Sequence, residues 1–193
     1  MILLLGPECP KIDAWFAERG HTLRRIEERL RSEVLVDLPV KLAISYRYRH
    51  IIMPDMVRML KGRLVNLHVS MLPWNRGADP NLWSFVENTP KGVTVHFIDE
   101  GVDTGDIIAQ REMEFDIERE TLATSYAKLD EAMVNLFLDV APALLTRQAT
   151  GVPQRQDAGS YHSLADRKRI EHLLVNGWDT PVGMLCGMGE TRE

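Results

Sequence analysis

The stretch NLHVSMLPWNRGADP, from Asn66 to Pro80, says more about the fold than any other part of this sequence. An apolar run leads into it, and Asn66 and His68 occupy alternate positions, so both side chains would point to the same side of a β-strand. The Leu72-Pro73 and Arg76-Gly77 pairs that follow predict a loop. Because loops at strand ends are where rigid scaffolds place functional groups, the stretch predicts a strand that ends at a site.

A second segment, GVTVHFIDEGVDTGDII from Gly92 to Ile108, predicts an alternating strand and then an acidic, glycine-containing turn with Asp103 at its tip. On its own, an Asn-x-His pair is more often an ordinary polar pair, and acidic turn residues usually cap or face solvent. Together, an amide, an imidazole and a carboxylate supply what acyl transfer needs: an oxyanion donor, a proton carrier and a group that orients it. Asn66, His68 and Asp103 are therefore candidate catalytic residues, whereas Ser70 has no adjacent base and is assigned a structural role.

The rest of the chain alternates predicted strands with predicted helices. Strands are predicted at residues 2–5, near residue 22 and at residues 42–46, and helices at residues 10–20, around Ile26 and Leu30, and at residues 54–62. This alternation predicts an α/β, Rossmann-like fold: a mostly parallel twisted sheet with helices on both faces and an active site at the carboxyl ends of the strands. Antiparallel additions to the sheet are expected after residue 92.

The C-terminal third is predicted to hold one long helix and a tail. After Thr121, a good N-cap residue, large side chains recur at spacings of three and four and are interpreted as core contacts: Leu122, Tyr126, Leu129, Met133, Leu136 and Val140. Pro142 should kink or end this helix. The chain beyond Gly151 is broken up by Gly and Pro, so we expect a catalytic domain at 1–150 and a tail at 151–193 that packs on it, with one short helix around residues 165–175.

Length and composition indicate a compact enzyme domain. A chain of 193 residues with 45% hydrophobic residues can bury a full core. Cys9 and Cys186 are too few and too distant in sequence to suggest a metal site or a disulfide framework, which favours a reducing cytoplasm. The start, MILLLGP, has no basic region and only four successive apolar residues, so neither a signal peptide nor a membrane partner is expected.

The two quoted segments resemble the signature of the folate-dependent formyltransferases, the family that includes the glycinamide ribonucleotide, methionyl-tRNA and sugar N-formyltransferases. The agreement covers roughly residues 42–120, and the seven-residue step from His96 to Asp103 also fits the family pattern. It implies the formyltransferase fold, a triad of Asn66, His68 and Asp103, and 10-formyltetrahydrofolate as the one-carbon donor, with no metal. Asn66 and a protonated His68 would stabilise the oxyanion, and Asp103 would orient His68 and help the amine to lose its proton.

The resemblance also suggests which residues hold the pterin ring of the donor. In the family, the segment around a strand end and the aspartate turn bind it, through main-chain groups more than through side chains. The matching residues in this sequence are His50, Ile52, Glu100, Gly101, Val102 and Asp103.

Charge and aromatic residues suggest where an acceptor would bind. Residues 41–76 contain seven Lys and Arg against the single acid Asp55, in a chain of net charge −5, so an anionic ligand would be drawn there. Arg58, Lys61 and Arg63 are expected to form a solvated helix face. In the loop beside the site, a guanidinium could take a phosphate or carboxylate and an aromatic ring could stack on a sugar or base, so the predicted substrate-binding residues are Arg76, Gly77 and Trp74.

The expected acceptor is a primary amine on a nucleotide-linked amino sugar or a similar small molecule. The segment GPECPK, residues 6–11, differs from the Gly/Ser/Asn phosphate loop of the glycinamide ribonucleotide enzymes, and a pI of about 5.7 does not suit a nucleic-acid partner. Glycinamide ribonucleotide or Met-tRNA as acceptor, a folate-binding protein without turnover, and a different acyl or carbamoyl transferase stay open, as does a homodimer.

Overall fold

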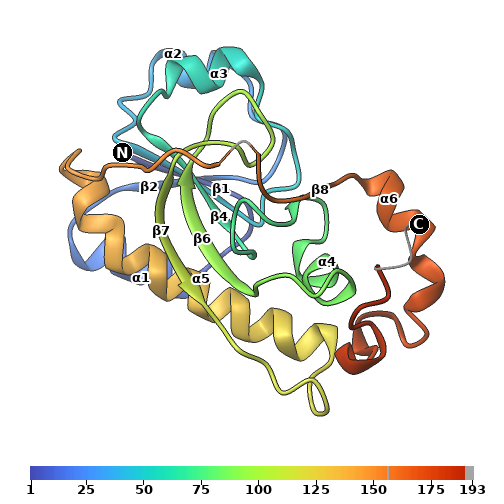
Figure 1. Cartoon of the computed structure of the whole chain (residues 1–193). Helices are drawn as coiled ribbons and strands as arrows, with labels where there is room; N and C mark the ends of the chain where they lie inside the picture. The colour runs from blue at the N-terminus through green and yellow to red at the C-terminus, as the bar shows by residue number, and fades with distance from the viewer. Residues whose placement is uncertain (156, 190–193) are drawn as a thin grey trace.

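The computed structural model describes residues 1–155 and 157–189, and its centre is a twisted six-stranded sheet (Figure 1). The strand order is β2-β1-β3-β4-β6-β7. The first four strands along that order are parallel, and β6 and β7 join antiparallel. Their bounds are β1 Ile2–Leu5, β2 Leu23–Ile26, β3 Leu42–Tyr46, β4 Leu64–His68, β6 Gly92–Phe97 and β7 Ile107–Glu112. The predicted α/β sheet and its antiparallel addition after residue 92 are confirmed.

Helices cover both faces of the sheet, as predicted. On one face lie α1 (Pro10–Glu18) and α5 (Leu122–Leu145), and on the other lie α2 (Glu33–Val36) and α3 (Pro54–Met59) (Figure 1). Strands β1, β3 and β4 are buried on both sides, because alternate residues of each strand pack into different cores. Thr121 caps α5 through its side chain, which accepts from the backbone N–H of Thr124.

The position of β4 in the sheet determines where a site can form. This strand runs parallel to β3 on one side and antiparallel to β6 on the other, with Asn66 opposite His96 and His68 opposite Thr94. The loops that follow β3 and β4 therefore both leave the sheet at the carboxyl ends of these strands and then separate. Such a crevice at the carboxyl ends of strands is the usual place for ligands in α/β sheets.

The C-terminal part of the chain docks beside the start of α5. A small sheet pairs β5 (Arg76–Gly77) with β8 (Tyr161–His162), and α4 (Pro80–Val86) packs under it. The remaining elements are α6 (Leu164–Arg169) and three short 3-10 helices at Glu171–Leu173, Gly177–Asp179 and Val182–Met184. Val182 and Leu185 complete a separate core cluster with the buried face of α4.

Three local predictions need correction. The helix expected around Ile26 and Leu30 is wrong, because Ile26 pairs with Leu5 as the last residue of β2 and the short helix α2 comes later. Pro142 does not end α5, which continues to Leu145. The helix expected around residues 165–175 is the shorter α6, followed by a 3-10 turn.

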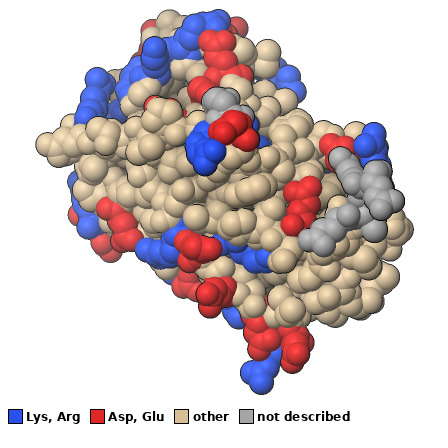
Figure 2. Space-filling view, viewed as in Figure 1, with Lys and Arg blue, Asp and Glu red and all other residues tan. Residues whose placement is uncertain are grey.

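Two findings concern surfaces. In residues 1–155 and 157–189, no helix is long and apolar enough to cross a membrane. Figure 2 shows basic side chains gathered at the end of the molecule that carries α2 and α3, while the middle of the same face is largely uncharged. Arg58 and Lys61 are exposed there as expected, but Arg63 is half-buried and donates to the carbonyls of Val40 and Met59.

Truncation of Phe137 tests the packing of α5 on the sheet. This side chain is 0% exposed and lies against Phe16 of α1, with 6.3 Å between ring centroids. Phe137→Ala should lower the free energy of unfolding by about 3–5 kcal/mol, because it removes apolar contacts and leaves a cavity. Urea denaturation followed by circular dichroism measures this. Val36→Ala is the control, since Val36 is 69% exposed, and equal losses in the two variants would contradict the packing described.

Candidate active site

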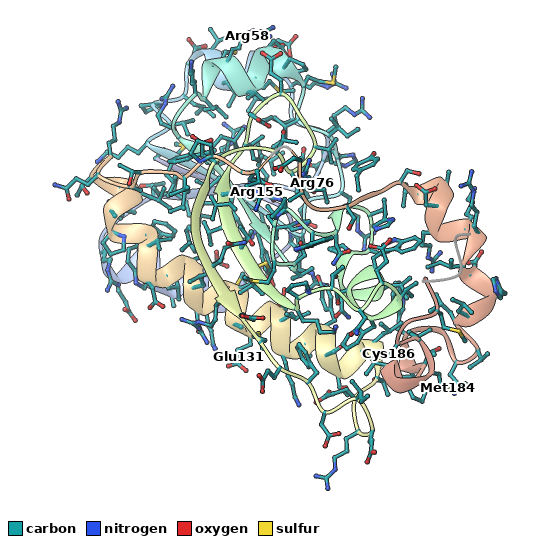
Figure 3. All side chains as sticks on the ribbon, in the orientation of Figure 1. Arg58, Arg76, Glu131, Arg155, Met184 and Cys186 are labelled. Atoms are coloured by element: carbon teal, nitrogen blue, oxygen red, sulfur yellow. The ribbon has the colours of Figure 1, made fainter. Side chains whose placement is uncertain are left out.

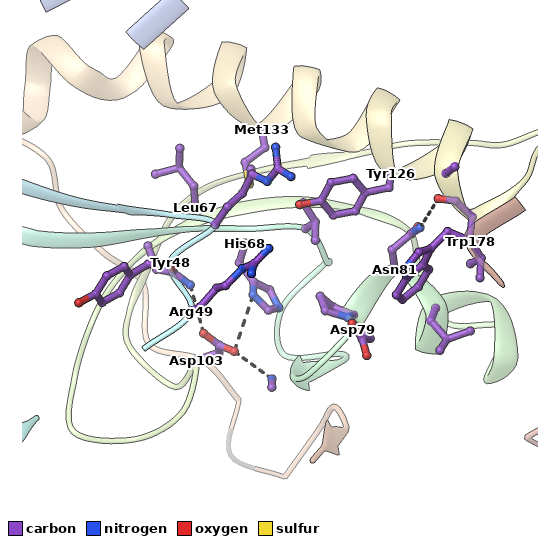
Figure 4. A pocket seen from close by; sticks show the side chains of 18 residues that line it. Tyr48, Arg49, Leu67, His68, Asp79, Asn81, Asp103, Tyr126, Met133 and Trp178 are labelled. Atoms are coloured by element: carbon purple, nitrogen blue, oxygen red, sulfur yellow. Dashed lines mark hydrogen bonds and ion pairs between the residues drawn. The ribbon is translucent and has the colours of Figure 1, made fainter. Parts of the chain in front are cut away.

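The candidate site opens at the carboxyl end of β4 into a cavity of about 720 Å³. Figure 4 shows His68 and Asp103 on one side of this cavity and Asn81, Tyr126 and Trp178 on the other. Segments that are distant in sequence build its wall: the loop after β3, the end of β4, the turn into α4, the Asp103 turn, one face of α5, and the tail. All three candidate catalytic residues line it.

The structure brings Asn66, His68 and Asp103 together, as their positions on strand and turn predicted. Asn66 Nδ2 donates to Asp103 Oδ1 over 3.2 Å, and His68 Nδ1 lies 3.7 Å from Asp103 Oδ2. The first distance is a hydrogen bond, whereas the second is too long for one. An amide, an imidazole and a carboxylate thus face one small volume at the end of the cavity.

Asp103 is held from several directions. Its backbone is left-handed, with φ of 53°, and its Oδ2 accepts from the Gly77 N–H over 2.9 Å. Burial alone would raise the pKa of this carboxyl, but His68, His96 and the Gly77 N–H outweigh that effect and hold the pKa well below its ordinary value. Asp103 is therefore ionised at neutral pH, and Gly77 contributes through its backbone as a wall of the cavity and a partner of the carboxylate.

His68 has a defined tautomer. Its Nε2 lies 3.2 Å from the carbonyl oxygen of Asn75, which can only accept, so Nε2 carries the proton and Nδ1 presents a lone pair toward Asp103 when the ring is neutral. Burial lowers the pKa of His68 below 6.5, although Asp103 opposes the shift. The expectation of a protonated His68 therefore does not hold for the free protein at neutral pH. The imidazole is poised to accept a proton there.

His96 is a fourth member of this cluster that the sequence analysis did not assign a role. It is buried on β6, its Nδ1 donates to the Phe97 carbonyl over 2.7 Å, and its Nε2 therefore accepts from Asn66 Nδ2 over 3.3 Å. The amide of Asn66 is thus oriented by both His96 and Asp103, and it must exchange one of these acceptors to donate to an oxyanion. Only the β4–β6 register brings His96 to Asn66, so the sequence carried no direct signal for this contact.

Arg76 and Trp74 are not brought into the cavity. The guanidinium of Arg76 donates to the backbone carbonyls of Pro73, over 3.2 Å, and Ala158, over 3.0 Å, and so ties the loop to the tail (Figure 3). Trp74 is half-buried, and its carbonyl accepts from Ser70 Oγ over 2.7 Å, which fits the structural role expected for Ser70. The predicted role of Arg76 as an anion clamp and of Trp74 as a stacking ring needs correction, because backbone contacts engage Arg76 and neither residue lines the cavity.

Of the predicted pterin residues, only Asp103 lines the cavity itself. The others are close in sequence to lining residues: His50 and Ile52 follow Arg49, and Glu100, Gly101 and Val102 precede Asp103. Glu100 pairs with Arg58 over 2.7 Å and so links the Asp103 turn to α3. Ile51 is 74% exposed and Val102 is 47% exposed, so each loop presents an apolar side chain to solvent.

Several lining residues were missed or read differently from the sequence. Tyr126 was interpreted as a core contact, but it lines the cavity together with Leu122 and Met133, so this face of α5 serves both the core and the site. Arg47 and Arg49 also line it, and they were counted only as part of the basic segment. The guanidinium of Arg47 lies 5.7 Å from the centre of the Tyr126 ring.

Trp178, in the tail, forms the far wall. It is 48% exposed, and the guanidinium of Arg167 lies 5.5 Å from its ring centre. Arg167 in turn lies 3.4 Å from Asp79, which also lines the cavity. An exposed tryptophan in an irregular tail is a signal that the sequence contained, but no spacing connected it to the catalytic strand.

Comparison with known proteins places this geometry in a family. The model of the formyl transferase family matches residues 13–141. A curated relative, the methionyl-tRNA formyltransferase of Bacillus thuringiensis, is 30% identical over 150 residues, which are 76% of this chain and 48% of the relative. The chain thus spans about half the length of the curated relatives it matches.

Two solved structures resemble the chain to different degrees. The formyltransferase PseJ from Anoxybacillus kamchatkensis, in complex with UDP-4,6-dideoxy-4-formamido-L-AltNAc and tetrahydrofolate, is 45% identical, with a TM-score of 0.92 over 97% of this chain and 98% of that one. A 4-N formyltransferase from Francisella tularensis is 23% identical, with a TM-score of 0.75 over 88% of this chain and 78% of that one. The second likeness shows the fold alone.

Titration of His68 tests the electrostatics of the site. Its imidazole should titrate below pH 6.5, because burial disfavours the charged ring. Asp103→Asn should lower the midpoint further, since it removes the negative charge that favours the imidazolium. Imidazole NMR signals followed against pH measure both midpoints, and His68→Gln identifies the signal by its loss. A midpoint at or above 6.5 in the unchanged protein would contradict the neutral state assigned to His68.

Proposed function

Because the chain belongs to the formyl transferase family, we propose that it moves a formyl group from 10-formyltetrahydrofolate to a primary amine of a nucleotide-linked amino sugar. One observation carries the proposal: Asn66, His68 and Asp103 converge at one end of a cavity whose other walls hold cationic and aromatic side chains. The likeness to PseJ over nearly the whole of both chains supports this class of acceptor, since PseJ was solved with a UDP-linked formamido sugar and tetrahydrofolate.

The cavity has the size and chemistry for such an acceptor. A volume of about 720 Å³ falls in the range of small-molecule sites, about 300–1,000 Å³. Arg47 and Arg49 offer guanidinium groups for a diphosphate, which such groups bind with two parallel hydrogen bonds. Trp178 offers an exposed ring on which a base or a sugar face can stack. Arg49 thus takes the role that the sequence analysis gave to Arg76.

The donor would enter between the loop after β3 and the Asp103 turn. Ile51 and Val102 expose apolar side chains on these two loops, which suits a flat aromatic ring with polar edges. The Arg58–Glu100 ion pair joins the turn to α3 and so keeps the second loop in place. Main-chain groups of residues 50–52 and 100–103 would then make the hydrogen bonds to the pterin.

The residues of the cluster can carry the proton that the reaction must move. The donor supplies a formyl carbon that the amine attacks, and the nitrogen of the amine must then lose a proton. Nδ1 of the neutral His68 accepts it, directly or through one water molecule, and the imidazolium that forms faces the ionised Asp103. The same proton can pass to the leaving nitrogen. Asn66, oriented by His96, donates to the developing oxyanion.

Other acceptors and a protein without turnover fit the observations less well. Met-tRNA fits less well because a tRNA partner favours a basic protein, whereas this chain carries a net charge of −5. A folate-binding protein without turnover would not need a buried imidazole and carboxylate facing one another, because each costs free energy to bury. The cytoplasm and a homodimer stay predictions; two free thiols suit a reducing compartment, and light scattering will give the oligomeric state.

Substitution of the three clustered residues tests the reaction. Asn66→Ala, His68→Ala and Asp103→Ala should each lower kcat by roughly 10²- to 10⁴-fold, the range for loss of an oxyanion donor or a general base. The assay follows formylation of a UDP-linked 4-amino-4,6-dideoxy sugar by mass spectrometry. Binding of 5-formyltetrahydrofolate, measured by calorimetry, should change little in Asn66→Ala and His68→Ala. Absence of a formylated product from the unchanged protein would overturn the proposed acceptor, and absence of folate binding would overturn the donor.

A matched pair of arginine variants tests the acceptor end. Arg49→Met should raise the KM for the nucleotide sugar with little change in kcat, because a phosphate clamp holds ground state and transition state alike. Arg76→Met should leave that KM nearly unchanged and lower the melting temperature, since its partners are backbone carbonyls. The reverse pattern, with KM rising only in Arg76→Met, would contradict the placement of these side chains.

A further inference from the structure

The tail packs directly on the turn that carries Asp103. Val152 and Ile107 exchange two backbone hydrogen bonds of 2.8 and 2.9 Å, so the start of the tail adds one more rung at the edge of the sheet. Gly151 lies so close to Asp106 that a side chain would collide with it. These contacts fix the path of the chain and bring Gln154 to the back of the Asp103 turn.

Gln154 holds this turn through hydrogen bonds to two of its backbone carbonyl groups. Its side chain is buried, and its Nε2 donates to the carbonyl oxygens of Asp103 and Gly105, each over 2.8 Å. Both partners can only accept, so the amide must turn its nitrogen toward them. Its Oε1 is buried with no hydrogen-bond partner in the part of the chain that the structure describes. The amide therefore contacts the turn through its donors alone.

The turn needs such support because its backbone is constrained. Asp103 is left-handed, a conformation that is uncommon outside glycine, although aspartate is among the residues enriched in it. Two residues later, Gly105 lies so close to the Phe97 carbonyl that a Cβ would collide with it. Gln154 bonds to the carbonyls at both ends of this short segment, and on the opposite side the Asp103 carboxylate meets Gly77, Asn66 and His68.

We infer that Gln154 is a positioning residue for the reaction, which holds the Asp103 turn so that the carboxylate faces His68 while the imidazole takes and returns a proton. This inference rests on the proposed function for its effect on turnover, although the geometry does not depend on it. Gln154 touches neither donor nor acceptor; it acts through Asp103. The tail thereby takes part in the site and does more than pack on the domain.

Gln154→Met tests the inference, because methionine has a similar volume and no donor. We expect kcat to fall by about 10- to 100-fold with both KM values nearly unchanged, since small displacements of a catalytic group cost that much. In an Asp103→Ala background the same substitution should change kcat by less than about twofold, because its effect passes through Asp103. If Gln154→Met still lowers kcat by about 10- to 100-fold in the Asp103→Ala background, the inference is overturned.

Gln110→Met is the matched control. Nε2 of Gln110 also donates two hydrogen bonds, to the Leu72 carbonyl over 2.8 Å and to Thr94 Oγ1 over 2.9 Å, but it has no bond to the Asp103 turn. Both variants should lose similar stability, and only Gln154→Met should show the large loss of kcat. If kcat falls equally in the two variants, Gln154 has only a structural role.

A measurement without turnover separates this inference from the proposed function. The charge of Asp103 favours the imidazolium of His68, so a carboxylate that drifts away in Gln154→Met should lower the midpoint of the His68 NMR titration. Gln110→Met should leave it in place. An unchanged midpoint in Gln154→Met overturns the inference even if formyl transfer is confirmed, and a lowered midpoint supports it even if the acceptor is another amine. If neither Gln154→Met nor Gln154→Ala folds, the role of Gln154 is structural and the inference fails.

Discussion

The burial of the Asp103 carboxylate is the constraint on which the rest of this structure depends. A carboxylate that is largely removed from water must find donors or lose its charge, and the donors here come from segments far apart in the chain. Asn66 donates from β4 and Gly77 from the small sheet, His96 of β6 orients the Asn66 amide, and Gln154 of the tail fixes the backbone behind the carboxylate. The negative charge of Asp103 is stable only when each of these segments is in place, so the site forms together with the fold.

The sheet makes this convergence possible because its strand pairing changes from parallel to antiparallel at β4. Because β4 pairs with β3 in parallel, the loop after β4 leads away from the strand. Because β4 pairs with β6 in antiparallel, a second polar residue, His96, lies directly beside Asn66. The crevice between these loops is open to ligands but lined by side chains that the sheet holds rigidly. In the proposed reaction, proton transfer at His68 would rely on burial, which lowers the pKa of the ring, and on the negative charge of Asp103, which opposes that shift.

Under the proposed function, the construction of the cavity would let one scaffold serve different acceptors. The triad end is built by strands and a short turn, whereas the other walls come from α5, the turn into α4 and the tail. Trp178 and Arg167 belong to the part of the chain with the least regular structure. Loops and tails can change without disturbing a sheet, so the acceptor end of the cavity is free to differ among proteins that share this fold.

The sequence by itself determined the α/β fold and the alternation of strands with helices, because hydrophobic period and strand alternation are local properties of segments such as Leu64–His68 and Gly92–Phe97. Asn66, His68 and Asp103 were predicted from their chemistry and from the resemblance to the formyltransferase signature. It could not determine register, so the contact between His96 and Asn66 was missed, and it misplaced a helix at Ile26, where pairing with Leu5 decided the outcome. The lowered pKa of His68 depends on burial, and Arg76 lies outside the cavity that Arg49 lines because its guanidinium donates to backbone carbonyls, one of them in the tail. Only the tertiary structure decides such contacts, because they join residues whose separation in sequence carries no periodic signal.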